Sequence, residues 1–133
     1  MAEAQHGDAP FDESTLAALM QLVSLDPKGE PAEALVELFA TNACEHVEAM
    51  RATPPASDPW THAAHSLKSS AGMFGAVELA RACAAAELLG RAAGTVRAVD
   101  AERTLAQIEE SLARALTVLG ERFPKAALGG KCV

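Results

Sequence analysis

Apolar residues recur along most of this chain at the three- and four-residue spacing of amphipathic helices. In the stretch 58–73, at about 100° per residue, the small and apolar positions fall within one sector, and His65 lies opposite its centre. Lys68 and Ser69, three and four residues further on, share the face of His65. The same face carries Thr61, His62 and Gly72. The pattern therefore predicts that His65 points into solvent.

Start and stop signals bound this helix. Asp58 is expected to cap its first turn, because a carboxylate accepts hydrogen bonds from free backbone amides, and Pro59 suits the first helical position. The helix is expected to end near Met73, where Gly72 and Gly75 permit a stop and a tight reversal.

Four more helices are predicted on either side of it. The first opens with Asp12 as its cap and with Phe11 packing on Leu16, and ends near residue 25. A turn at residues 26–31 precedes the second. The remaining predicted ranges, from that turn onward, are about 32–51, 76–94 and 98–119, the last with a heptad-like apolar stripe. Gly94 is expected to end the helix that begins at residue 76.

These elements predict an all-α fold, an antiparallel four-helix bundle with an additional short N-terminal helix across one end. A chain of 133 residues is long enough for one domain with a core of its own. We expect residues 1–10 to be a flexible tail, 11–122 to form the bundle, and 123–133 to be a flexible C-terminal tail.

Composition narrows the function classes. A net charge of -7 argues against nucleic-acid binding, which needs clustered Lys and Arg to neutralise phosphates. No apolar run approaches the roughly 18 residues that cross a bilayer. The N-terminus has neither the basic segment nor the apolar segment of a signal peptide. We therefore expect a cytoplasmic protein without membrane partners.

The cysteines do not suggest a site. Cys44, Cys83 and Cys132 are odd in number and widely spaced, which fits neither a disulfide framework nor a zinc site. We expect Cys44 and Cys83 to be small helix residues and Cys132 to be exposed in the terminal tail.

The segment from His65 to Gly75, His-Ser-Leu-Lys-Ser-Ser-Ala-Gly-Met-Phe-Gly, resembles the signature of histidine-containing phosphotransfer (HPt) domains. In that family a His-x-Leu-Lys core is followed by small residues and a later Gly, and Ser69 stands where Gly is common. The next predicted helix extends the resemblance to a Leu-x3-Cys-x2-Leu-Glu-x3-Arg-like pattern. The matching residues are Leu79, Cys83, Ala86, Glu87 and Arg91.

The resemblance implies that His65 accepts a phosphoryl group from an aspartyl phosphate on a receiver domain and passes it to another. It implies that Lys68 offsets the charge of the phosphoryl oxygens. The implied partners are receiver domains of response regulators, or a hybrid histidine kinase, or both. We expect this protein to be a monomer and to need no cofactor. Any Mg²⁺ would belong to the receiver, and the chain lacks a nucleotide loop for autokinase activity.

The residues expected to border the partner are His62, Ser69, Gly72, Gly75, Glu87 and Arg91. Small side chains at Ser69 and Gly72 would let the partner approach, and a Ser69 hydroxyl could bond to the imidazole. Gly75 fits either a close turn or a simple helix cap. Glu87 and Arg91 fit surface salt bridges equally well, and His62 also fits a solvated neighbour.

Two other functions compete with the relay. A helical adaptor could bind a receiver or kinase domain without being phosphorylated. His62 and His65 could also share a metal ion on one helix face, but further ligands are not evident and we expect no metal. His46 lies on the apolar side of its helix and is expected to be a hydrogen-bonded core or boundary residue.

Overall fold

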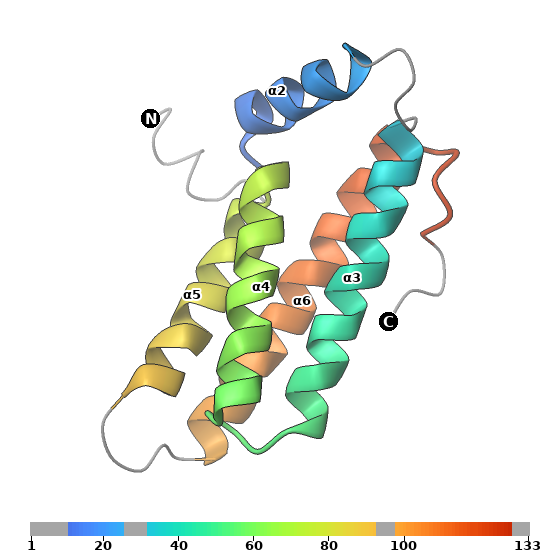
Figure 1. Ribbon diagram of the computed structural model, residues 1–133. Coiled ribbons are helices and arrows are strands. Elements are labelled where there is room, and N and C mark those ends of the chain that lie inside the picture. The colour runs from blue at the N-terminus through green and yellow to red at the C-terminus, as the bar shows by residue number, and fades with distance from the viewer. Residues whose placement is uncertain (1–10, 26–31, 93–97, 129–133) are drawn as a thin grey trace.

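The computed structural model describes residues 11–25, 32–92 and 98–128, and the regular structure within these ranges is helical. Its elements are α2 (Glu13–Ser24), α3 (Ala32–Ala52), α4 (Asp58–Phe74), α5 (Val77–Arg91) and α6 (Ala98–Arg122). Helices α3 to α6 run alternately up and down as a four-helix bundle, and α2 lies across one end (Figure 1). The predicted fold class is confirmed.

The apolar stripes of the four long helices meet in one core. Phe39 of α3 and Phe74 of α4 pack with their ring centroids 4.6 Å apart. Trp60 lies fully buried at the other end of α4. The heptad-like stripe predicted for the last helix is buried almost throughout, at Ala101, Ile108, Leu112, Ala115, Leu116 and Leu119. This packing leaves the opposite face of each helix to solvent.

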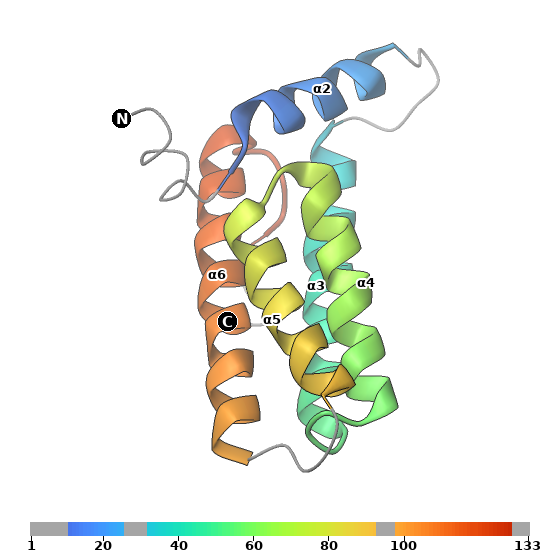
Figure 2. The same cartoon turned by 90° about the vertical axis from the view of Figure 1, so that its left-hand side faces the viewer.

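Helices α4 and α5 form the most extensive helix pair of the bundle and lie side by side (Figure 2). The turn between them is tight, because Gly75 adopts the left-handed conformation at φ 75° and Ala76 N–H donates to the carbonyl of Ala71 at 2.8 Å. This is the glycine-based helix end that the sequence predicted. The two helices therefore form an antiparallel hairpin.

The predicted cap of α4 is wrong by one residue. Ser57 has the extended backbone of a cap residue, and its hydroxyl accepts from Trp60 N–H at 3.4 Å. Asp58 is already helical, so its carboxylate only adds a favourable charge to the first turn, and Pro59 follows within that turn. Adjacent residues of equal capping ability are difficult to separate by sequence.

The start of α2 follows the prediction. The Asp12 carboxylate accepts from the Ser14 hydroxyl at 2.8 Å and from the backbone N–H groups of Ser14 at 3.1 Å and Thr15 at 3.4 Å. These hydrogen bonds, the one from the Ser14 side chain above all, lower the pKa of Asp12. Phe11 and Leu16 are both buried in the core. The turn predicted at 26–31 lies outside the described residues.

Two helix ends differ from the predictions. Helix α5 ends at Arg91, since Ala92 is extended at φ -67° and ψ 139°; the predicted stop at Gly94 lies outside the described residues. Helix α6 continues to Arg122, past the predicted end at Leu119.

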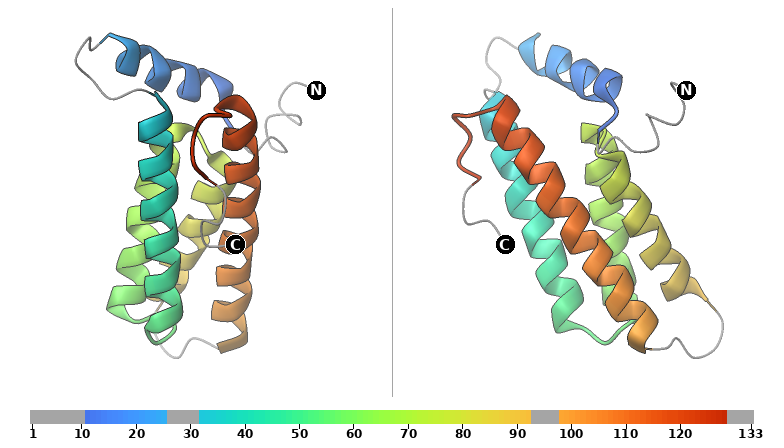
Figure 3. Two further views of the ribbon diagram at one scale, coloured as in Figure 1. Left: turned by 90° about the vertical axis from the view of Figure 1, so that its right-hand side faces the viewer. Right: turned by 180° about the vertical axis from the view of Figure 1, so that it is seen from behind.

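Residues 123–128, which the sequence assigned to a C-terminal tail, turn back against the bundle (Figure 3). Leu128 is buried, and Ala127 N–H donates to Glu37 Oε2 of α3 at 2.7 Å. The reason for the difference is that Leu128 gives this short segment an apolar anchor. The predicted tails at 1–10 and 129–133 lie outside the described ranges.

The cysteines differ in state. Cys83 is a free, buried thiol of α5, as expected for a small helix residue. Cys44 of α3 is half-buried and disulfide-bonded, so the expectation that the cysteines form no disulfide is wrong for Cys44. Cys132 lies outside the described residues. No helix in the described part of the chain is long and apolar enough to span a membrane.

Candidate functional site

His65 projects from the middle of α4 with half of its side chain exposed to solvent. Its exposure confirms the prediction from helical periodicity. The ring is nevertheless held, because Nδ1 lies 2.9 Å from Oε2 of Glu87 on α5. A carboxylate of α5 therefore orients the exposed imidazole of α4.

Glu87 is buried, with a side chain 3 % exposed, and this burial rules out the surface salt-bridge interpretation. Lys68 Nζ lies 2.5 Å from Oε1, and Arg91 Nη2 lies 2.9 Å from Oε2. Oε1 has no well-aligned hydrogen-bond donor among the described residues, so the Lys68 contact is primarily an ion pair. Glu87 thus joins His65, Lys68 and Arg91 in one cluster.

The charge of Glu87 settles the tautomer of His65. Burial by itself raises the pKa of this carboxyl, but the contacts with Lys68 and His65 outweigh burial and hold the pKa below its ordinary value of 4.5. At neutral pH Glu87 is therefore a carboxylate and can only accept hydrogen bonds. Nδ1 of the neutral ring must carry the proton, and Nε2 keeps a free lone pair.

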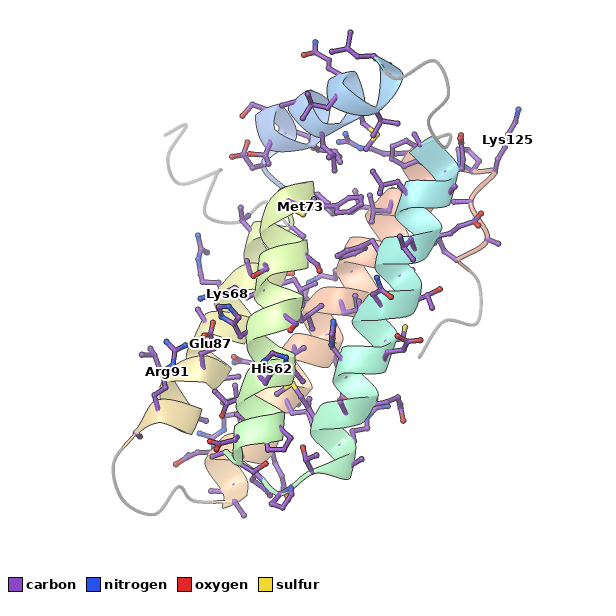
Figure 4. All side chains as sticks on the ribbon, in the orientation of Figure 1. His62, Lys68, Met73, Glu87, Arg91 and Lys125 are labelled. Carbon is purple, nitrogen blue, oxygen red and sulfur yellow. The ribbon has the colours of Figure 1, made fainter. Side chains whose placement is uncertain are left out.

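Lys68, Glu87 and Arg91 gather along the seam between α4 and α5, with His62 on the neighbouring part of α4 (Figure 4). Two cations around one carboxylate leave the seam with a net charge of about +1, whereas the whole chain carries -7. An exposed nucleophilic nitrogen beside a local positive charge suits a dianionic phosphoryl group.

Comparison with known proteins agrees with this geometry. The Hpt domain family model matches residues 34–118, from the first turn of α3 to the last turns of α6. The chain belongs to the Hpt family. Searches of curated proteins and of solved structures gave no match. Membership gives this Hpt domain a general role in histidine phosphotransfer within phosphorelays, where such domains interact with receiver domains and kinases.

The face of α4 around His65 is open. His62, Ser69 and Gly72 are all exposed, and a Cβ added at Gly72 would meet no heavy atom of the described residues within 4 Å. No hydrogen bond joins Ser69 to the imidazole within the described ranges. Met73, 59 % exposed, adds an apolar residue that the sequence analysis missed, although it lies eight residues beyond His65 on the same face.

Gly75 lies away from this open face of the Hpt domain. It is buried, its carbonyl accepts from Asp12 N–H at 2.6 Å, and an added Cβ would lie 2.7 Å from the Asp12 carbonyl oxygen. Gly75 is therefore not available for direct contact with a partner, and its expected place on the docking surface is corrected. Its role is to end α4 where α2 begins.

The other described histidines form no centre of their own. His46 of α3 is half-buried at the edge of the core, and burial lowers its pKa, with His62 acting in the same direction. His6 lies outside the described ranges. Residues 11–25, 32–92 and 98–128 contain no group of three or more His, Cys, Asp or Glu side chains that could hold a metal ion.

Proposed function

We propose that His65 is the phosphorylation site of this Hpt domain and relays a phosphoryl group between it and aspartates of response-regulator receiver domains, one of which can belong to a hybrid histidine kinase. The observation that carries the proposal is the hydrogen bond from His65 Nδ1 to the buried Glu87 carboxylate. It leaves Nε2 as the free nucleophilic atom on the exposed side of the ring.

The step follows from the tautomer. Nε2 attacks the phosphorus of an aspartyl phosphate, an N–P bond forms, and the P–O bond to the aspartate breaks, which returns a free carboxylate. No proton has to leave Nε2. The ring becomes positively charged with its proton still on Nδ1, and Glu87 stabilises that charge at 2.9 Å. Reversal of the same step passes the phosphoryl group onward.

Lys68 and Arg91 supply positive charge beside the reacting nitrogen. Both contact Glu87, yet both side chains are more than a third exposed, with 36 % and 66 % of their surface open to solvent. An ammonium has three donors, so Lys68 can keep its contact with Glu87 and still attract phosphoryl oxygens. We assign Lys68 the main role, because it shares the helix and the face of His65.

The partner would dock on the open face of α4, over His62, Ser69, Gly72 and Met73. The small residues allow close approach, and Met73 offers apolar contact. We expect Mg²⁺ to be held by the receiver, and we expect a cytoplasmic monomer without autokinase activity.

The proposal is tested by incubating the protein with radiolabelled phosphorylated receiver domains. We expect an acid-labile, alkali-stable label that is lost in His65→Gln and kept in His46→Gln, the matched control, because His46 lies on α3 outside the open face of α4. An unlabelled wild-type protein that still binds a receiver would instead establish the adaptor function. Stoichiometric zinc or iron lost in His62→Gln would establish a metal site.

A further inference from the structure

Gly90 of α5 lies against Thr61 of α4 more closely than any side chain would allow. A Cβ added at Gly90 would lie 1.8 Å from Thr61 Oγ1 and 2.8 Å from both Thr61 Cβ and Cγ2. A different rotamer of Thr61 moves Oγ1 and Cγ2 but leaves Cβ in place, since Cβ is fixed by the α4 backbone. Oγ1 also donates to the Ser57 carbonyl at 2.9 Å, which favours the present rotamer. At this point the two helices touch without room for a methyl group.

The contact lies next to the site. Thr61 precedes His65 by four residues on α4, and Gly90 follows Glu87 by three residues on α5. Because the helices are antiparallel, the Thr61 and Gly90 pair is about one helical turn from the His65 and Glu87 pair. The turn at Gly75 closes the hairpin at its other end. The hairpin is thus held close on both sides of the hydrogen bond at His65.

We propose that Gly90 is a positioning residue for phosphotransfer: by letting α5 lie directly on Thr61, it keeps the Glu87 carboxylate within hydrogen-bond reach of His65 Nδ1. The inference rests on the proposed function of His65. A side chain at residue 90 would push the end of α5 away from α4 and carry Glu87 with it. An increase of even 1 Å in the 2.9 Å separation would end the hydrogen bond and release the tautomer.

The test compares wild type with Gly90→Ala and with the double variant Thr61→Gly/Gly90→Ala, in which the methyl group has room. In ¹⁵N-detected imidazole spectra of the unphosphorylated protein, we expect the two ring nitrogens of His65 to have clearly different shifts in wild type, as one tautomer requires. The shifts should converge in Gly90→Ala and separate again in the double variant. Transfer from a phosphorylated receiver should slow by about tenfold in Gly90→Ala and recover with the shifts. Gly120→Ala in α6 is the control, since a Cβ there meets Leu128 Cδ1 at an ordinary 3.9 Å.

A folded Gly90→Ala protein with wild-type nitrogen shifts would overturn the inference. If Gly90→Ala does not fold, Thr61→Ala/Gly90→Ala replaces it, because that pair keeps only the 2.8 Å clash between Cβ atoms. Shifts that lie between those of free imidazole and wild type then support the inference, and shifts equal to wild type contradict it. These spectra need no phosphoryl donor, so they test the effect of Gly90 on the His65 tautomer independently of phosphotransfer. A wild-type protein that takes no label would refute the proposed function, but it would not change the interpretation of the nitrogen shifts.

Discussion

Oε2 of Glu87 lies 2.9 Å from Nδ1 of His65, although the glutamate is buried in α5 and the histidine is exposed on α4. This contact between the buried Glu87 carboxylate and the exposed His65 ring affects both groups. The imidazole gains a fixed tautomer, and the carboxylate gains a partner that offsets part of its desolvation. Both effects can be measured separately.

Replacement of Glu87 by Gln should slow phosphotransfer by about tenfold to a hundredfold. This is the rate factor that corresponds to the free energy of one hydrogen bond to a charged group. The amide keeps the shape of the side chain but can donate as well as accept, so neither tautomer of His65 is enforced. Single-turnover transfer from a labelled receiver measures the rate. Glu102→Gln, at an exposed position of α6, should be unaffected. A Glu87→Gln rate within about twofold of wild type would contradict the role of the carboxylate.

Glu87 should also make the stability of the fold depend on acid. Its pKa is lower in the folded protein than its ordinary 4.5, so the unfolded chain binds the proton more readily. The stabilisation is therefore present above that ordinary value and is lost as the pH falls through the lowered pKa. Urea unfolding from neutral pH to about pH 3 should show wild type losing stability more steeply than Glu87→Gln. Parallel profiles of unfolding free energy against pH for the two proteins would show that the Glu87 carboxylate contributes no pH-dependent stability.

A large side chain at Gly72 should block the partner without disturbing the fold. The position is exposed and lies seven residues beyond His65, on the same face of α4. Gly72→Trp should keep the helical circular dichroism of wild type while transfer falls by about a hundredfold, the cost of displacing reacting atoms by roughly 1 Å. Gly72→Ala should keep transfer and raise the free energy of unfolding by up to about 1 kcal/mol. Full transfer by Gly72→Trp would place the docking surface elsewhere.

Gly75→Ala should be costly for a different reason. The residue sits at φ 75°, and the new Cβ would approach the Asp12 carbonyl oxygen to 2.7 Å. Left-handed backbone alone costs about 1–2 kcal/mol for a residue with a Cβ, and the clash adds to that. Thermal or urea unfolding should show this loss. Gly120→Ala should show none, because it has ordinary space in α6.

Cys83 should be inert in the native protein. Burial raises the pKa of its thiol to about 12, and the nearby Glu87 charge acts in the same direction. Near pH 8 only about one thiol in ten thousand would be ionised, even if reagent could reach it. Iodoacetamide treatment followed by peptide mass spectrometry should find Cys83 unmodified until denaturant is added. Rapid native labelling would mean that α5 opens readily.

Periodicity predicted much of this molecule because each helix of a bundle has one buried face. It predicted the helices of the described ranges and the exposure of His65, and the capping signal at Asp12 predicted where α2 begins. The sequence did not identify the correct cap where two adjacent residues can both cap a helix, as with Ser57 and Asp58 at the start of α4.

The burial of the Glu87 carboxylate was not predicted, for another reason. Glu87 lies four residues beyond Cys83, on the buried stripe of α5, so its position signalled burial. Its charge argued for the surface, because acidic residues are rarely buried unless paired. The pairing with His65 and Lys68 depends on how two helices pack against each other. The same is true of the contact between Thr61 and Gly90, which no single-helix pattern contains.

His65 and Glu87 are separated by 22 positions in the sequence, and the turn at Gly75 lies between them. The entropic cost of closing so short a loop is small and grows only with the logarithm of its length. Contacts between residues close in sequence also favour fast folding. His65 and the carboxylate that orients it are therefore brought together by a single hairpin, without a contact between distant parts of the sequence.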